Sequence, residues 1–353
     1  MEAIGGCETP GLEEGIAVNL NVNETPPESP AWPRLVADIG GSNARFGWIR
    51  AVGHAIEHVR TLSVAAHASP VEAARAYLQD CAAQLGAAYR PPRHAAFAVA
   101  TAVQDDCIEF TNSNWRFSRQ AALAALGLQS LLVLNDFEAL ALSVPGLKAS
   151  QLRGFGPPAA AEGCCAVIGP GTGLGVATVL QTRQGWVAMA GEGGHATLAP
   201  TNALESDILA AVRTRYEHVS AERLLSGIGL PELHWAVNTV QARPTEPVRT
   251  EDIVQRGLRG DDPSCSQTLD IFCAMLGSFA GSVALTVGAR GGVYIGGGIV
   301  PRLGDRFFSS QFRASFVAKG RFRAYLEGIP CAVILDTLAA LEGAAYAVEQ
   351  SLN

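Results

Sequence analysis

The chain of 353 residues lacks several patterns that assign a protein to a class at once. Its eight cysteines include no C-x-x-C pair and no Cys/His cluster at metal-ligand spacing, which argues against a zinc module and against a disulfide framework. No basic residue precedes Arg34, so the first residues do not read as the charged start of a secretory signal. We therefore expect reduced thiols and a cytoplasmic protein.

Charged residues are also scarce, at 17% of the chain against 48% hydrophobic residues. The formal net charge is −7, yet residues 1–33 contain six Glu and no Lys or Arg, which leaves 26 basic and 27 acidic residues from Arg34 onward. Residues 1–33 carry several prolines and no apolar periodicity, so they are predicted to be a disordered acidic extension. Dispersed basic residues without interleaved aromatic residues predict no nucleic-acid partner.

An uninterrupted, strongly apolar run of membrane-spanning length is missing as well. The nearest candidate, residues 271–289, is uncharged but contains three Gly, two Ser and a Thr. A span is expected to hold about 20 predominantly apolar residues. Gly277 and Gly281 have the spacing that lets helices approach closely. We therefore predict a buried, closely packed helix and no membrane partner.

What is present is a repeated pattern of strand, Gly-rich turn and strand. Residues 35–39 and 44–49 flank the first turn, and about 130 residues later residues 165–168 and 176–180 flank the second. Helical and strand patterns alternate elsewhere, which is typical of an α/β protein. The repeat predicts a duplicated α/β unit with a cleft between two lobes, over residues 34–137 and 138–353. Helices are predicted over residues 69–86, 119–126, 137–142, 204–215, 221–226, 231–241, 251–258, 264–287 and 338–350, and further strands over residues 56–64, 95–103, 131–134, 292–295 and 332–335.

The Gly-rich turns do not belong to the two best-known nucleotide loops. A dinucleotide fingerprint leads into a helix, whereas the turn at Gly40 and Gly41 leads into the strand formers Phe46 and Trp48. The G-K-[ST] ending of a P-loop and the G-x-S-x-G elbow of hydrolases are both missing. Backbone N–H groups of Gly-rich turns can still bind phosphate, and each turn alone can equally be a simple tight turn. Three such turns, counting Gly296 to Gly298, favour a nucleoside triphosphate site.

Two aspartates follow apolar strands. Asp38 precedes the first glycine pair, and it reads either as an acid that faces Mg²⁺ through water or as a turn residue bonded to the Gly amides. Asp136 follows the strand 131–134 and Asn135, and it opens an apolar helix. Ligands of α/β sheets usually bind at such a strand end, but both residues are also good helix N-caps.

A third cluster combines carboxylates with an imidazole. Glu192 and His195 stand three residues apart in Gly191–His195, where they suit a polyol better than a metal, although a lone His is often structural. Glu222 begins the predicted helix 221–226, where its charge can either stabilise the helix N-terminus or contact a ligand.

Together these segments resemble the bacterial glucokinase family of ATP-dependent hexokinases. The resemblance covers the chain from about Arg34 to the C-terminus and depends on the order of eight motifs. They are Ala37–Arg45, Thr111–Trp115, Leu134–Phe137, Gly169–Gly175, Gly191–His195, Ser220–Arg223, Leu225–Gly227 and Gly296–Pro301. It implies the two-lobed actin-like, ribonuclease H-like α/β fold of sugar kinases.

The resemblance also implies roles for single residues. Asp136 would be the catalytic base that accepts the proton of the glucose 6-hydroxyl, with ATP as phosphoryl donor and a homodimer as the assembly. Mg²⁺ would accompany ATP, and the strand pattern above makes Asp38 its candidate ligand through water. The glucose ligands it implies are Asn135, Asp136, Glu192, His195 and Glu222. The ATP ligands it implies are Ala37, Asp38, Ile39, Gly40, Gly41, Ser42, Gly169, Gly171, Thr172, Gly173, Gly296, Gly297 and Gly298.

Two alternatives remain open at this point. One is a kinase for another hexose, although the related repressor and kinase group carries a Cys-rich zinc motif after its sugar-binding His, and none follows His195. The other is a non-catalytic ATP-binding protein that senses sugar. A DNA-binding regulator would need a helix-turn-helix, for which residues 1–33 have no helical pattern.

Overall fold

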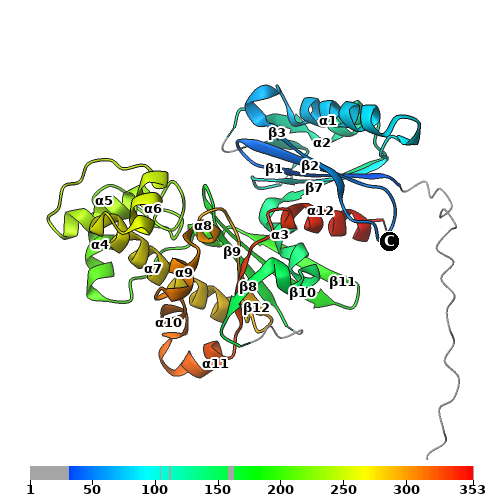
Figure 1. Ribbon diagram of the computed structural model, residues 1–353. Helices are drawn as coiled ribbons and strands as arrows, with labels where there is room; N and C mark the ends of the chain where they lie inside the picture. Colours follow the sequence, from blue (N-terminus) through cyan, green and yellow to red (C-terminus); the bar gives the residue numbers. More distant parts are fainter. Residues whose placement is uncertain (1–31, 104, 111–112, 158–162, 353) are drawn as a thin grey trace, which may run out of the picture. The chain divides into compact units, whose positions relative to one another are not determined.

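The first sheet has five strands in the order β3-β2-β1-β4-β7 (Figure 1). In the computed structural model, residues 32–103, 105–110, 113–157 and 163–352 are described; most of the predicted extension 1–33 and part of the motif Thr111–Trp115 lie outside them. β1 and β2 form the predicted antiparallel hairpin, and β1, β4 and β7 are parallel. The strands are β1 (Arg34–Ile39), β2 (Asn43–Ile49), β3 (Glu57–Ser63), β4 (His94–Val99) and β7 (Ser130–Asn135).

The second sheet, of six strands, repeats this topology. Its order is β11-β10-β9-β12-β13-β8, in which β9 is antiparallel to β10 and parallel to β12, as β1 is to β2 and β4. The predicted duplication of the α/β unit is therefore confirmed. The strands are β8 (Leu152–Phe155), β9 (Cys165–Pro170), β10 (Leu174–Thr182), β11 (Gly185–Gly191), β12 (Gly292–Ile295) and β13 (Cys331–Ile334), and β5 (Cys107–Glu109) and β6 (Arg116–Ser118) form a separate pair.

Most of the longer helices agree with the sequence patterns. Helix α1 begins after Ser69, whose hydroxyl accepts a hydrogen bond from the N–H of Glu72 at 3.1 Å, as the Ser-Pro start predicts. The α-helices are α1 (Pro70–Leu85), α2 (Arg119–Leu126), α3 (Asp136–Ser143), α4 (Ala203–Arg213), α5 (Leu230–Val240), α6 (Thr250–Arg259), α7 (Pro263–Val287), α8 (Val300–Leu303), α9 (Asp305–Ser309), α10 (Phe312–Val317), α11 (Arg323–Glu327) and α12 (Ala339–Gln350).

Alternate residues of the central strands enter different cores. On β1, Leu35, Ala37 and Ile39 belong to a core shared with α1 and α2, whereas Val36 belongs to a core that contains α3 and α12. The period of two along a strand explains this division. On β9, Val167 enters the same core as Val36. Helices α3 and α12 therefore pack against both sheets.

The contact between α3 and α12 depends on a glycine. A β-carbon at Gly343 of α12 would collide with the carbonyl oxygen of Ala139 in α3, so only glycine permits this approach. Helix α12 also packs against β1 and β4 of the first sheet. The C-terminal helix thus contacts strands from the first third of the chain. The predicted boundary after residue 137 stays a prediction.

Helix α7 contains most of the long apolar stretch, residues 271–289. It is the one described helix that is long and apolar enough to cross a membrane, and 61% of its most apolar window is buried inside the protein. A β-carbon at Gly277 would collide with the backbone carbonyl of Phe312, and one at Gly281 with that of Phe316. Both phenylalanines belong to α10. The prediction of a buried, closely packed helix is confirmed.

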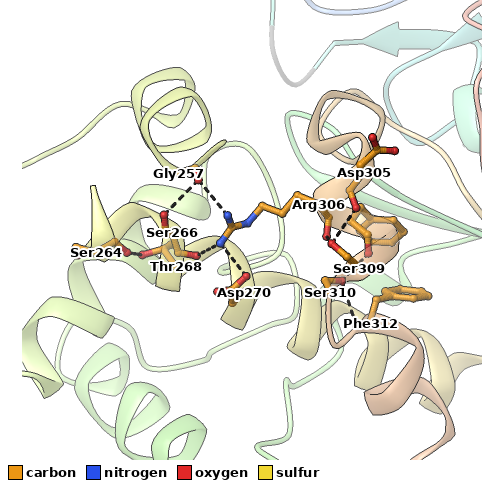
Figure 2. A network of polar contacts seen from close by, with 11 residues as sticks. Gly257, Ser264, Ser266, Thr268, Asp270, Asp305, Arg306, Ser309, Ser310 and Phe312 are labelled. Carbon is orange, nitrogen blue, oxygen red and sulfur yellow. Dashed lines mark hydrogen bonds and ion pairs between the residues drawn. The ribbon is translucent and has the colours of Figure 1, made fainter. Parts of the chain in front are cut away.

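The side chain of Arg306 connects α9 to α6 and α7 (Figure 2). Its guanidinium donates to the carbonyl oxygens of Gly257 in α6 and Ser266 in α7, at 3.1 and 2.7 Å. It also pairs with the carboxylate of Asp270 at 2.8 Å. One side chain therefore fixes three helices.

Two predictions of local structure were wrong, and several short elements were not predicted. Residues 221–226 form turns and bends rather than a helix, because the helical bond from the N–H of Leu225 to the carbonyl of Ala221 is not continued and the N–H of Gly227 bonds to the carbonyl of Gly171 instead. Strand β4 ends at Val99 rather than at residue 103, because its neighbour β1 ends at Ile39 and the N–H of Thr101 turns back to the carbonyl of Val99. The sequence patterns also missed β5, β6, β8, β11 and the short helices α8 to α11.

Candidate active site

The sequence left open which of Asn135 and Asp136 is the N-cap of α3 and which can face a ligand. Asn135 is the N-cap of α3, since its side-chain oxygen accepts hydrogen bonds from the N–H groups of Phe137 and Glu138 at 2.9 and 3.4 Å. Its amide nitrogen donates to the carbonyl of Thr101 at 3.1 Å. Asp136 is the first residue of the helix, and one oxygen accepts from the Phe137 N–H at 2.9 Å. The cap role therefore belongs to Asn135, and the second oxygen of Asp136 has no part in capping.

The charge of Asp38 acts on Asp136 although the two residues come from different elements. The alternation along β1 turns Asp38 away from Ala37 and Ile39, which lie in the core of the first sheet. Burial, together with the negative charges of Asp38 and Glu192, raises the pKa of Asp136 to about 7. Burial also raises the pKa of Asp38, an effect that the charge of Arg45 opposes. The site thus holds a carboxyl group that titrates near neutral pH.

Arg45 is a site residue that the sequence reading missed. It stands opposite Asp38 in the register of the β1-β2 hairpin, and its guanidinium lies 3.3 Å from the Asp38 carboxylate. Counting residues across the Gly40 to Ser42 turn would have found this pair. Arg45 also donates to the carbonyl of Thr337 at 3.1 Å, just before α12.

Glu192, His195 and Glu222 lie close together. The Nε2 atom of His195 is 3.9 Å from a Glu192 oxygen and 3.8 Å from Oε1 of Glu222. Both distances exceed the length of a hydrogen bond, so Nε2 of His195 and the facing carboxylate oxygens stay available to a ligand. The side chains of Glu192 and His195 are 71% and 61% exposed, which leaves them open to a solute. The alternative role of Glu222 at a helix N-terminus is wrong, because no helix begins there.

A cavity of about 220 Å³ lies between Glu192 and the start of α3. Asn135 and Glu138 line it from one side and Glu192 from another. Ala102 and Val103, which follow β4, complete the lining together with Ala190 and Gly191 of β11. Since the cavity combines polar and apolar walls, it suits a small polar ligand.

The second Gly-rich turn meets two further loops. The N–H of Gly171 bonds to the carbonyl of Gly173, and the carbonyl of Gly171 accepts from the N–H of Gly227 at 2.8 Å. The carbonyl of Pro170 accepts from the N–H of Ile299, directly after Gly296 to Gly298. Gly297 has a φ of 77°, and a β-carbon there would lie 2.5 Å from the Pro170 oxygen. The structure therefore brings Gly169 to Gly173 together with Gly296 to Gly298.

The first Gly-rich turn is closed by its own hairpin. Gly40 donates to the carbonyl of Asn43 at 2.9 Å, and the carbonyl of Ser42 accepts from the N–H of Val64 after β3. Ala37 and Ile39 are fully buried, so that only their backbone is left for a ligand. Gly41 and Ser42 are accessible.

The comparisons with known proteins agree with one another. A family profile described as Glucokinase matches residues 35–351. The chain belongs to the glucokinase family. It is 46% identical to a glucokinase of Aromatoleum aromaticum over 325 residues, which cover 92% of this chain and 97% of that protein. The expectation drawn from the sequence motifs is thereby confirmed.

Solved glucokinases have the same fold. The crystal structure of a glucokinase from an Antarctic psychrotroph matches with a TM-score of 0.81 at 35% identity, and the match covers 90% of this chain and 98% of that one. A ROK family glucokinase from Streptomyces griseus, in complex with glucose and AMPPNP, matches with a TM-score of 0.57 at 18% identity over 90% of this chain and 100% of that one. The predicted two-lobed actin-like α/β fold is confirmed.

Proposed function

We propose that the protein is an ATP-dependent glucokinase, which transfers the γ-phosphoryl group of ATP to the 6-hydroxyl of glucose. The observation that carries this proposal is Asp136, a half-buried carboxyl group at the start of α3 with a pKa near 7. A general base works best when its pKa lies near the operating pH. Membership of the glucokinase family, together with the glucose and AMPPNP complex of the Streptomyces griseus relative, supports the choice of sugar and nucleotide.

In the proposed reaction, oxygen O6 of glucose attacks the γ-phosphorus while its proton moves to the Asp136 carboxylate. The O6–P bond forms, the bond between the γ-phosphorus and the bridging oxygen breaks, and ADP leaves with that oxygen. Asp136 must be ionised to accept the proton. The neighbours that raise its pKa strengthen the carboxylate as a base, and they also lower the ionised fraction below pH 7. After the transfer, the proton on Asp136 passes to solvent.

We assign the sugar hydroxyls to Asn135, Glu192, His195 and Glu222. The exposed Glu192 and His195 face solvent, and the imidazole lies between two carboxylates at 3.8 and 3.9 Å. Carboxylates accept from hydroxyls, and a neutral imidazole both donates and accepts, so the three side chains can bind neighbouring hydroxyls of one ring. Such contacts would hold O6 in line with the phosphorus.

The phosphates of ATP are assigned to the two Gly-rich turns, with Gly296 to Gly298 beside the nucleoside. Backbone N–H groups in these turns can approach phosphate oxygens without a β-carbon in the way. Mg²⁺, when bound with ATP, would supply positive charge at the β- and γ-phosphates. Asp38 is the carboxylate we assign to it, through water, since a cation bound by phosphates and waters needs few protein ligands. Among the described residues, no group of three or more His, Cys, Asp or Glu is placed to hold a metal ion by itself.

A coupled assay for ADP release tests the proposal. Glucose, mannose, fructose and N-acetylglucosamine are supplied in turn, with Mg·ATP and with ATP alone. Glucose should give the highest kcat/KM, and omission of Mg²⁺ should abolish turnover. ADP release that no sugar increases would refute the kinase function, and a higher kcat/KM for another hexose would move the substrate assignment. We further propose a homodimer in the cytoplasm, which light scattering and cell fractionation check.

A further inference from the structure

The two oxygens of Glu222 point to two different parts of the site. Oε2 accepts a hydrogen bond from the N–H of Leu174 at 2.8 Å, and Leu174 directly follows the Gly169 to Gly173 turn. Oε1 lies 3.8 Å from Nε2 of His195, a separation too long for a hydrogen bond. One carboxylate therefore holds the turn assigned to phosphate and faces the residues assigned to sugar.

The backbone around Glu222 makes the same connection. The N–H of Glu222 donates to the carbonyl of Gly194 at 2.8 Å, within the short 3-10 helix that ends at His195. Five residues later, the N–H of Gly227 donates to the carbonyl of Gly171 at 2.8 Å. The segment from residue 222 to 227 is thus bonded to the sugar side at one end and to the Gly-rich turn at the other.

Gly173 makes the approach of the carboxylate possible. A β-carbon at this position would collide with Oε2 of Glu222. The φ angle of Gly173 is not in the left-handed region that favours glycine, so backbone strain does not explain the residue. The need for a glycine follows from the space that the Glu222 side chain occupies.

We infer that Glu222 is a positioning residue that couples sugar binding to the conformation of the Gly169 to Gly173 turn, an inference that rests on the proposed function. A sugar hydroxyl that donates to Oε1 fixes the carboxylate, and the fixed carboxylate holds the Leu174 N–H and the turn before it. Binding of glucose then lowers the cost of ordering the turn around the nucleotide. By thermodynamic linkage, nucleotide must tighten glucose binding by the same factor.

Calorimetry measures this factor as the ratio of glucose Kd values without and with Mg·AMPPNP. In the wild-type protein we expect a ratio of about 5 or more, the lower end of typical allosteric couplings. Gly173→Ala should reduce the ratio toward 1 without removing a sugar ligand. Glu222→Gln should also reduce it, because an amide cannot accept hydrogen bonds at both of its ends.

Matched controls separate coupling from general damage. Gly146→Ala makes the same change where a β-carbon meets no atom within 4 Å, and it should keep the wild-type ratio. Glu72 lies in the first turn of α1, and its Oε2 also accepts a hydrogen bond from a backbone N–H, that of Ala68 at 2.7 Å. Glu72→Gln should therefore keep the wild-type ratio too.

The outcomes distinguish this inference from the proposed function. If the wild-type protein phosphorylates glucose but its ratio is 1, or if Gly173→Ala and Glu222→Gln keep the wild-type ratio, the coupling is wrong and the kinase function stands. Absence of any sugar-dependent ADP release refutes the function itself. Circular dichroism checks the fold of both variants, and if Gly173→Ala does not fold, the ratio of Glu222→Gln decides.

Discussion

The ring of Phe137 fills the space that a side chain at Gly175 would need. A β-carbon at Gly175 would collide with this ring, and one at Gly169 would lie 2.5 Å from it. Phe137 therefore packs over the β9-β10 hairpin on both sides of the Gly-rich turn. Because it directly follows Asp136, this packing ties the proposed base to the proposed phosphate turn.

Gly175→Ala should consequently affect both stability and turnover. The added methyl group overpacks the contact with Phe137, which costs about 1 to 3 kcal/mol of unfolding free energy. The start of α3 must shift to relieve the clash, so kcat should fall while the protein remains folded. Thermal unfolding and the coupled assay measure the two effects, with Gly146→Ala as the glycine control.

A double variant tests whether the effect passes through the ring. Phe137→Leu removes part of the ring and makes room for the new methyl group, so the losses in Gly175→Ala/Phe137→Leu should be smaller than the sum of the single losses. Simple addition of the two free-energy changes would show that Gly175 acts through another neighbour.

The sequence could predict the parts of the site that local patterns determine. The Gly-rich hairpins and the ends of β1 and β7 follow from apolar runs and glycine positions, and these placed Asp38 and Asp136 correctly at strand ends. The choice between Asn135 and Asp136 as N-cap needed the structure, because both residue types suit that position equally well.

Other parts depend on tertiary contacts that leave little trace in the sequence. The edge strand β11 is largely exposed and lacks an alternating pattern, and helices α8 to α11 have only four to six residues each. Glu222 was predicted at the start of a helix over residues 221–226, which does not form. Its bond to Leu174 spans 48 residues, and no local pattern encodes that contact.

Arg306→Met should destabilise the protein without changing its chemistry. The substitution removes the donors to Gly257 and Ser266 and breaks the pair with Asp270 (Figure 2). Loss of donors to partly buried carbonyls costs about 1 to 3 kcal/mol. We expect a lower urea midpoint with unchanged KM for glucose.

Arg259→Met is the matched control for Arg306→Met. Arg259 pairs with Asp261 at 2.8 Å, but both side chains are more than half exposed. Exposed ion pairs contribute about 0 to 1 kcal/mol, so this variant should unfold close to the wild-type midpoint. Equal midpoints for the two variants would contradict a structural role for the Arg306 network.

Asp136→Asn should separate binding from catalysis. An amide keeps the size of the side chain but cannot accept the O6 proton, so kcat should fall about 100- to 10,000-fold while calorimetry still detects glucose binding. Asp80→Asn makes the same chemical change at an exposed position near Arg60 and should leave kcat unchanged. Near-normal turnover of Asp136→Asn would exclude Asp136 as the base.

The same variant should be more stable than the wild type at alkaline pH. The folded-state pKa of Asp136 lies above the ordinary value of 3.8, so its ionisation opposes folding. The penalty is zero below about pH 4, grows as the pH rises toward 7 and is complete above it. Asp136→Asn removes the penalty, on the order of 4 kcal/mol at most, which urea unfolding at pH 5 and pH 8 can resolve. A stability difference that does not grow with pH would contradict the raised pKa.

The pH dependence of turnover then follows from the ionised form of Asp136. The plot of kcat/KM for glucose should fall about tenfold per pH unit below pH 7 and level off above it, because only the carboxylate accepts a proton. Asp38→Asn removes a negative charge that raises the pKa of Asp136, so the acid limb should move to lower pH even though the Mg·ATP site is weakened. Glu192→Gln should move it in the same direction by less, since the charge of Glu192 has a smaller effect on this pKa. Glu72→Gln, on α1, should leave the limb where the wild type has it. An acid limb that stays in place in Asp38→Asn would mean that a group other than Asp136 controls the reaction.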